Sequence, residues 1–179
     1  SSVVEDVPKP MAPVNGKPFL HYLFQQLAKT DITRVILAIH HKREVITDFF
    51  GDSYLGIEVK YSVEEYALGT GGGIRQALTK CKGEQAIVLN GDSLIDLNLA
   101  NFTEQFDGSS APMSMALRYM EDVSRYGAVE TEGNILTEFK EKGQQKGAGY
   151  INSGVYLIQK EYFLNHTPEG NFSMETEFL

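Results

Sequence analysis

Apolar residues recur along this chain with two different periods, and these periods predict alternating helices and strands. One predicted helical face, with apolar residues at i, i+3, i+4 and i+7, consists of Leu20, Leu23, Phe24 and Leu27. The β-branched run at 34–39 is typical of a buried strand, and residues 57–62 alternate as a strand does. Between them, the charged stretch from Lys42 to Phe50 predicts a second helix, which ends at Gly51.

The next two elements continue this alternation. Residues 70–80 predict a helix whose first turn is rich in glycine, and residues 86–89 predict a buried strand that runs into Asn90-Gly91-Asp92. An order of strand, helix, strand and helix implies a mostly parallel sheet with helices on both faces. We therefore expect an α/β fold, a Rossmann-like three-layer sandwich around that central sheet.

The second half of the chain has a different pattern. Strands are predicted at 113–119, 128–131, 135–140 and 150–158, with a hairpin turn at 132–134 and a polar loop at 144–149. These strands predict an antiparallel extension of the sheet. The sequence contains no internal repeat and no interdomain linker, so we expect a single domain over residues 1–179.

Composition narrows the classes of function. The chain has 179 residues, of which 42% are hydrophobic and 22% charged, as in ordinary globular proteins. The net charge of −8 argues against nonspecific nucleic-acid binding but leaves room for a small phosphorylated ligand held by a few lysines and a divalent metal. No apolar run is long enough to cross a membrane, and the polar residues 1–10 do not resemble a signal peptide, so a cytoplasmic location is expected.

The single cysteine, Cys81, excludes an intrachain disulfide. It falls late in a predicted helix, between lysines, and the local sequence supplies no histidine partner for a nucleophilic thiol. We interpret Cys81 as structural.

The first candidate motif is the proline-rich segment 8–18, which contains Lys9 between Pro8 and Pro10. Prolines fix the backbone around this lysine, and a lysine held in place suits a phosphate. A surface connector with solvated lysines is the alternative, and the residue types alone slightly favour it.

The second motif is the glycine-rich segment 65–74, which follows a strand and begins a helix. Glycines allow a ligand to lie against the backbone, and the N–H groups of a helix N-terminus favour anions. Ile74 replaces the third glycine of a dinucleotide fingerprint, and no Gly-Lys-Ser/Thr follows as in a P-loop. A flexible turn is the alternative, but three consecutive glycines disfavour a helix so strongly that we expect a functional reason for them.

The remaining motifs are ordinary when taken singly. Asp92 ends a buried strand, where ligands of open α/β sheets gather and where an aspartate can hold Mg²⁺. The segments 125–127, 138–142 and 152–154 offer polar groups at strand ends and loops. A strand-ending cap, hairpin charges and a strand bulge explain them equally well.

Together and in this order, the motifs resemble the sugar-1-phosphate nucleotidyltransferase family over residues 7–179. The resemblance implies the nucleotide-diphospho-sugar transferase fold and catalytic roles for Lys9 and Asp92. It implies nucleotide binding by Lys9, Glu65, Leu68, Gly69, Thr70, Gly71, Asn90 and Gly91. It implies sugar-phosphate binding by Tyr126, Gly127, Glu141, Lys142 and Asn152, and a Mg²⁺ site at Asp92 and Glu177.

The implied reaction is attack of a sugar 1-phosphate oxygen on the α-phosphorus of a nucleoside triphosphate, with release of pyrophosphate. The segments 11–17, 89–93 and 172–175 resemble the family branch that uses GTP and D-glycero-α-D-manno-heptose 1-phosphate for bacterial surface polysaccharide. Mannose-1-phosphate guanylyltransferases are the runner-up, followed by thymidylyl and uridylyl transferases.

Two features keep other interpretations open. The family signature normally begins with a strand and a Gly-Gly-x-Gly-Thr-Arg loop ahead of the proline-rich segment, so we expect residues 1–179 to lack this loop and the carboxyl-terminal end of the domain. A noncatalytic regulatory subunit of the same fold is the main alternative, although the presence of Lys9, Asp92 and Lys142 favours an enzyme. The failed glycine fingerprint disfavours a dinucleotide-dependent oxidoreductase, and the sequence leaves a homo-oligomer open.

Overall fold

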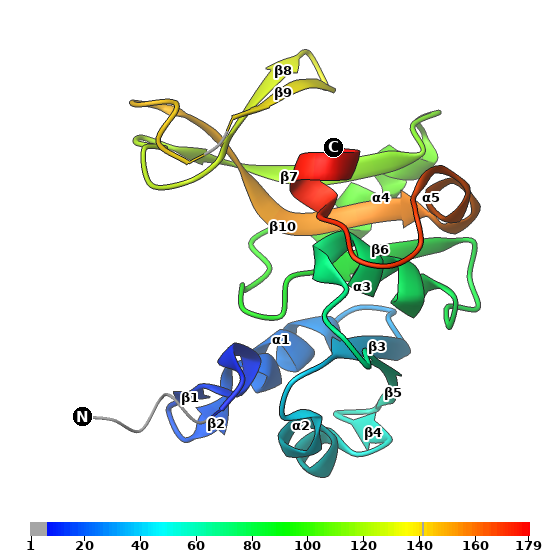
Figure 1. Cartoon of the computed structure of the whole chain (residues 1–179). Helices are drawn as coiled ribbons and strands as arrows, with labels where there is room; N and C mark the ends of the chain where they lie inside the picture. The colour runs from blue at the N-terminus through cyan, green and yellow to red at the C-terminus, as the bar shows by residue number, and fades with distance from the viewer. Residues whose placement is uncertain (1–6, 141) are drawn as a thin grey trace.

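A computed structural model describes residues 7–140 and 142–179, and its elements form two groups that follow one another along the chain (Figure 1). The first group comprises η1 (Lys9–Met11), β1 (Pro13–Val14), β2 (Lys17–Pro18), α1 (Phe19–Leu27), β3 (Arg34–Ile39), α2 (Arg43–Phe50), β4 (Ser53–Tyr54) and β5 (Ile57–Val63). The second comprises α3 (Gly69–Leu78), β6 (Gln85–Leu89), α4 (Leu99–Asp107), β7 (Met113–Met120), β8 (Ala128–Glu132), β9 (Ile135–Lys140), β10 (Gly149–Gln159), α5 (Lys160–His166) and η2 (Met174–Phe178). No helix in these described ranges is long and apolar enough to span a bilayer.

The first group is a small sheet packed against two helices. Strand β3 pairs with β5 in parallel, and β4 pairs with β5 antiparallel. The predicted apolar face of α1 is buried, and Phe24 on that face stacks on Phe50 of α2 with ring centroids 5.0 Å apart. Tyr54 packs edge-on against both rings, so aromatic contacts join α1, α2 and β4.

Strand β10 organises the second group. It pairs antiparallel with β6, β7 and β8, and β9 adds to β8 as the predicted hairpin. Four consecutive residues of β10, Val155 to Ile158, are buried, as expected of a strand covered on both faces. The pairing of β10 with β7 shifts between Asn152 and Tyr156, so the strand contains a bulge at 153–155. Figure 1 shows the β8–β9 hairpin extending above the rest of the second group.

The prediction of a mixed α/β fold is confirmed, and each helix and strand predicted from periodicity is present. A mostly parallel central sheet is not seen among the described strands, where β3–β5 is the parallel pair and all other pairs are antiparallel. The reason is that β3 pairs with β5 alone and β6 pairs with β10 alone within this part of the chain. The helices α4 and α5 were not predicted.

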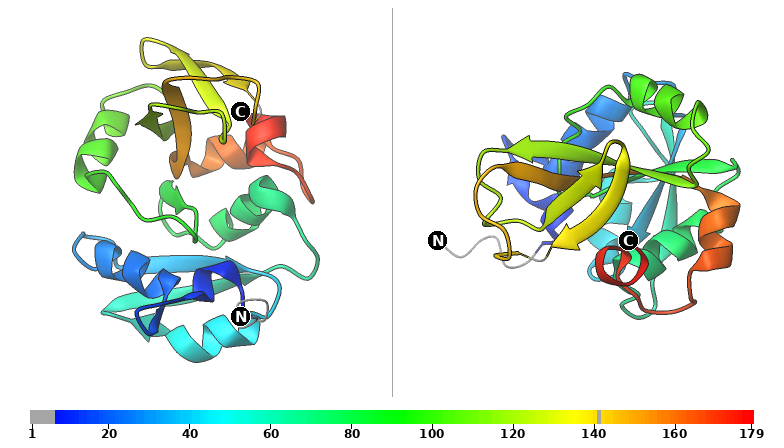
Figure 2. Two further views of the ribbon diagram at one scale, coloured as in Figure 1. Left: turned by 90° about the vertical axis from the view of Figure 1, so that its left-hand side faces the viewer. Right: turned by 90° about the horizontal axis from the view of Figure 1, so that it is seen from above.

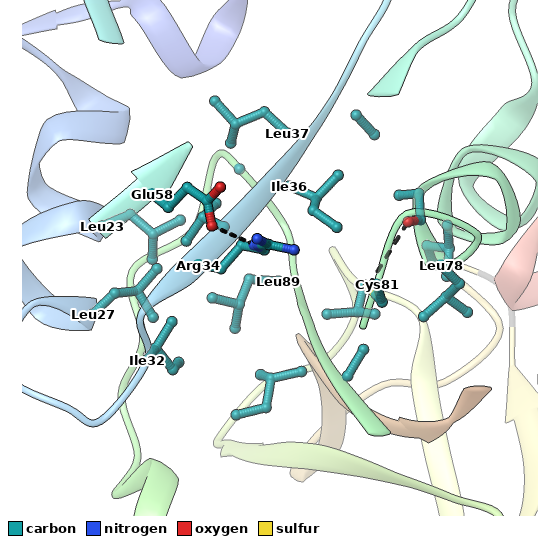
Figure 3. Close-up of a pocket in the computed structure, with 18 of the residues that line it drawn as sticks. Leu23, Leu27, Ile32, Arg34, Ile36, Leu37, Glu58, Leu78, Cys81 and Leu89 are labelled. Carbon is teal, nitrogen blue, oxygen red and sulfur yellow. Dashed lines mark hydrogen bonds and ion pairs between the residues drawn. The ribbon is translucent and has the colours of Figure 1, made fainter. Parts of the chain in front are cut away.

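An apolar slot separates β3 from β6. This cavity, of about 780 Å³, is lined along its length by residues 31–39 and 85–89 and closed on one side by α1 and on the other by α3. Figure 3 shows Ile36 and Leu37 of β3, Leu89 of β6, and Leu78 and Cys81 beside the same space. The left-hand view of Figure 2 shows the two groups one above the other, and the slot lies where they meet. Two strand edges therefore face each other without pairing.

Cys81 lines this slot, and the reactivity of its thiol can be used to test whether it is buried there. Burial raises the pKa of the Cys81 thiol, and its Sγ lies 3.8 Å from the carbonyl oxygen of Ala77. Because the thiolate is the reactive form, we expect an aromatic disulfide reagent to react several-fold more slowly with the folded chain at pH 8 than with the chain unfolded in urea. The difference is expected to shrink as the pH rises above the folded-state pKa. Equal rates at pH 8 would contradict the burial of this thiol, and a Cys81→Ser chain gives the blank.

Candidate functional site

The segment around Lys9 meets the carboxyl end of β6. The turn η1 is closed by the Met11 N–H, which donates to the Pro8 carbonyl at 2.7 Å, and Met11 is buried in the core of the first group. Pro10 and Gly91 both line the slot, and a Cβ added to Gly91 would lie 3.4 Å from Cγ of Pro10. Lys9 directly precedes Pro10, and Asp92 directly follows Gly91. Both side chains are exposed. The two predicted catalytic residues therefore belong to segments in contact.

The end of β6 also touches the bulge of β10. The Asn90 N–H donates to the Gly154 carbonyl at 2.9 Å, and Oδ1 of Asn152 accepts the Gly154 N–H at 2.8 Å. Gly154 has a φ of +74°, and a Cβ there would lie 2.4 Å from Nδ2 of Asn90, so only glycine fits. Residues predicted for the nucleotide side and for the sugar side, Asn90 and Asn152, are thus brought together at one glycine.

The glycines of the glycine-rich segment allow close packing within the chain, whereas the sequence pattern suggested a ligand against the backbone. A Cβ on Gly71 would lie 2.1 Å from the ring of Phe172, and a Cβ on Gly72 would lie 2.1 Å from the Gly170 carbonyl oxygen. The Phe172 carbonyl accepts the N–H groups of both Gly71 and Gly72, at 3.0 and 3.4 Å. These two N–H groups at the start of α3 therefore bond to the chain itself and are not offered to an anion, and the close approach that the glycines permit is that of residues 170–172.

The other residues predicted to contact the nucleotide lie around this packing. Leu68 is buried, and its N–H donates to the Glu64 carboxylate at 3.1 Å. Gly69 has a φ of +71°, and Thr70 and Glu65 are exposed. Their predicted contacts with a nucleotide stay predictions.

Three of the residues predicted to bind the sugar phosphate, Tyr126, Gly127 and Lys142, lie near the ends of the β8–β9 hairpin strands. Tyr126 is exposed, and its N–H donates to the carbonyl of the fully buried Val123 at 2.8 Å. A Cβ on Gly127 would lie 3.2 Å from the Lys140 carbonyl oxygen, so residues 126–127 lie beside the end of β9. Lys142 is exposed just beyond that end, whereas the predicted residue Glu141 lies outside the described residues.

Lys140 and Lys142 differ in their surroundings. The ammonium group of Lys140 forms an ion pair with the Glu130 carboxylate, and this hydrogen bond raises the pKa of Lys140. Glu138 lies 3.9 Å away on the same lysine. Lys140 is thus engaged by the hairpin's own carboxylates, which is consistent with assigning the phosphate to Lys142.

The predicted metal ligands are two separate carboxylates. Asp92 is exposed after β6, and Glu177 is exposed in η2, where its Oε2 accepts the Ser173 N–H at 2.7 Å. Across residues 7–140 and 142–179, no three His, Cys, Asp or Glu side chains gather to form a metal site built from protein ligands alone. This donor set fits Mg²⁺ better than a metal that needs a complete protein cage, because Mg²⁺ is commonly held by one or two carboxylates together with substrate phosphates.

Glu64 and Glu175 are polar residues of this region that the sequence interpretation missed. Glu64 supports the turn before α3, and Oε2 of Glu175 accepts the Thr70 hydroxyl at 2.7 Å. No local pattern indicated the contact of Glu175, because Thr70 and Glu175 are 105 residues apart in sequence.

Comparisons with known proteins show which sequences and structures this chain resembles. A family model described as nucleotidyl transferase matches residues 3–176. The chain is 44% identical over 179 residues to D-glycero-alpha-D-manno-heptose 1-phosphate guanylyltransferase of Campylobacter jejuni, covering 99% of this chain and 78% of that protein. It is 42% identical over 178 residues to the protein of the same name from Aneurinibacillus thermoaerophilus, covering 99% and 77%. The crystal structure of HddC from Yersinia pseudotuberculosis complexed with GMP-PN superposes with a TM-score of 0.87 at 32% identity, covering 100% of this chain and 79% of that one.

The glycine packing predicts an unusual effect of alanine. In a helix interior, Gly→Ala normally stabilises by about 1 kcal/mol. Because the new methyl group of Gly72→Ala would lie 2.1 Å from a backbone oxygen, we expect this variant to lose about 1 to 3 kcal/mol in free energy of unfolding. Urea denaturation measures the change.

Gly108→Ala is the matched control. Its Cβ would lie 3.5 Å from the nearest oxygen, that of Glu104, and its φ of −77° suits any residue. We expect this variant to unfold at the same or a higher urea concentration than the unsubstituted chain. A Gly72→Ala chain as stable as Gly108→Ala would show that residues 170–172 do not pack as described.

Proposed function

Because the chain belongs to the nucleotidyl transferase family, we propose that it transfers GMP from GTP to D-glycero-α-D-manno-heptose 1-phosphate, forming the GDP-sugar and releasing pyrophosphate. It is a sugar-1-phosphate guanylyltransferase, EC 2.7.7.-. The observation that carries the proposal is the meeting at the carboxyl end of β6, where the Lys9 segment contacts Gly91 and the Asn152 bulge bonds to Asn90. The segments predicted to bind the phosphate, the metal and the sugar thus lie next to one another.

The reaction needs positioning and charge neutralisation more than bond chemistry by the protein. A phosphate oxygen of the sugar 1-phosphate attacks the α-phosphorus of GTP, a new P–O bond forms, and the bond to pyrophosphate breaks in line. Lys9 stabilises charge at the attacked phosphate, and Lys142 anchors the phosphate of the sugar. The attacking phosphate is already anionic, so no side chain has to remove a proton.

Asp92 and Glu177 are the residues proposed to hold Mg²⁺. When bound, the ion supplies charge neutralisation around the α-phosphate. Each carboxylate keeps at least one oxygen clear of the hydrogen bonds formed by residues 7–140 and 142–179, as an incoming ion requires. Tyr126, Gly127, Glu141 and Asn152 are proposed to bind the sugar, and Glu65, Leu68, Gly69, Thr70, Gly71, Asn90 and Gly91 the nucleotide.

The finer form of the fold is part of this proposal. We infer that β5–β3 and β6–β10 belong to one sheet of a Rossmann-like sandwich, interrupted at the slot. Helices α1 and α3 lie along both sides of that slot, which supports a common sheet between two helical layers.

A noncatalytic regulatory subunit and a mannose-1-phosphate guanylyltransferase are the competing functions. Incubation of the full-length protein with Mg²⁺, one nucleoside triphosphate and one sugar 1-phosphate separates them. We expect pyrophosphate release to be fastest with GTP and the heptose phosphate. No release with any pair would support the regulatory subunit, and faster release with mannose 1-phosphate would support the second alternative.

Substitution of Asp92 tests the metal assignment. Asp92→Asn removes a charged ligand while preserving shape, so we expect pyrophosphate release to fall by roughly a hundredfold with the fold intact. Asp48→Asn, an exposed position on α2, is the control and is expected to keep full turnover. Turnover within about twofold of the unsubstituted protein in Asp92→Asn would remove Asp92 from the metal site.

A further inference from the structure

Helix α1 contacts both segments that carry the proposed catalytic residues. On the side of Lys9, the N–H of Phe19 at the start of α1 donates to the Ala12 carbonyl at 2.9 Å, directly after the turn η1. On the side of Asp92, Gln26 near the end of α1 is hydrogen-bonded to the loop that follows β6. One helix therefore supports both segments.

The contact on the Asp92 side is a pair of hydrogen bonds between one side chain and one backbone residue. Nε2 of Gln26 donates to the Ile95 carbonyl at 2.8 Å, and Oε1 of Gln26 accepts the Ile95 N–H at 3.0 Å. Two residues of antiparallel strands exchange bonds in the same way, and here a side-chain amide takes the place of one strand. Glutamine suits this contact because its amide offers both a donor and an acceptor.

The surroundings of this pair make the two bonds important. The Ile95 side chain is buried in the same core cluster as Met11, Leu20 and Leu23, and Gln26 is half-buried. Backbone N–H and C=O groups in such a place need partners, because water reaches them poorly. An apolar residue at position 26 would remove both bonds. The glutamine therefore serves the loop after β6, whereas the leucines of α1 serve the core.

Asp92 lies between two anchored points of this loop. The Asn90 N–H is hydrogen-bonded to β10, and the Ser93 N–H reaches the Asn90 carbonyl at 3.4 Å, so Asp92 lies in a turn. Ile95 follows Asp92 by three residues, which span at most about 10 Å of extended chain. The anchoring of Ile95 by Gln26 therefore limits where the Asp92 carboxylate can lie.

We propose that Gln26 is a positioning residue that fixes Asp92 relative to Lys9, with α1 as their common support. This inference rests on the proposed function. Gln26 acts through the backbone of Ile95 and not by contact with a substrate. Without its amide, residues 91–94 gain freedom, and the Asp92 carboxylate spends less time where it can share an ion with the substrate phosphates.

The first test measures amide hydrogen exchange by mass spectrometry in Gln26→Met, which keeps the length of the side chain and removes the amide. We expect peptides that cover residues 91–97 to exchange several-fold faster, and those that cover β3 and β5 to be unchanged. This readout needs neither metal nor substrate. Gln25→Met is the matched control, because Gln25 is an exposed glutamine next to Gln26 on the same helix.

The second test measures pyrophosphate release by the full-length protein as the Mg²⁺ concentration is varied. We expect the Mg²⁺ concentration for half-maximal turnover to rise about three- to tenfold in Gln26→Met, as the loss of two hydrogen bonds that hold a ligand loop implies.

Gln76→Met is the control for loss of stability. Gln76 is a half-buried glutamine of α3 whose Nε2 donates to the Val63 carbonyl at 2.8 Å and to the Ser62 hydroxyl at 3.0 Å. It loses comparable bonds away from the loop, so we expect an unchanged Mg²⁺ requirement. All variants are compared at equal folded fraction, measured by urea denaturation.

A double variant tests whether Gln26 acts through Asp92. Gln26→Met is expected to lower turnover several-fold at a fixed, subsaturating Mg²⁺ concentration when Asp92 is present. In the Asp92→Asn protein the ligand that Gln26 positions is already lost, so adding Gln26→Met is expected to change turnover by less than about twofold.

The outcomes are distinct. No pyrophosphate release by the unsubstituted protein with any substrate pair would overturn the proposed function and this inference with it. Given normal release, each of three results would overturn the inference alone: an unchanged Mg²⁺ requirement in Gln26→Met, exchange of residues 91–97 equal to that in Gln25→Met, or the same fractional loss of turnover with and without Asp92.

Discussion

The packing of residues 170–174 on the start of α3 is the constraint on which the arrangement of the site depends. The Phe172 carbonyl accepts two N–H groups of the helix, the Phe172 N–H donates to the Leu68 carbonyl at 3.0 Å, and Nδ2 of Asn171 donates to the Ala67 carbonyl at 2.7 Å. Such an approach of two backbones is possible only where side chains are absent, which is why α3 begins with a run of glycines. The turn that precedes the helix therefore has a defined shape before any ligand arrives.

This constraint couples the carboxyl-terminal segment to the rest of the site. Met174 and Phe172 anchor it in the core beside Tyr156 and Leu78, and the polar residues that alternate with them are left to face the turn. The two carboxylates have different partners. Glu175 accepts the Thr70 hydroxyl, and Glu177 accepts the Ser173 N–H at the N-terminus of η2. Apolar anchoring thus positions the charged groups with little freedom.

Local patterns in the sequence predicted most of the elements, but apart from the β8–β9 hairpin they did not predict which strands pair. The run Arg34–Ile39 has the same bounds as strand β3, because a continuous β-branched run needs no distant information. Helix α4 was missed although Leu99, Phe102 and Phe106 have helical spacing behind the Asn98 cap, since the surrounding aspartates and asparagines indicate a loop. The role of the glycines could not be predicted, because residues 170–172, which pack on Gly71 and Gly72, are remote from them in sequence. The partners of β10 are also not adjacent to it in sequence, so the order of strands around it depends on tertiary packing.

The slot between β3 and β6 also bears on how the two groups are joined. Within the described residues β3 and β6 each leave one edge without a partner strand, and aliphatic side chains line the space between them. One extended segment lying between these strands would complete the hydrogen bonding of both edges and merge the two sheets into a single continuous one.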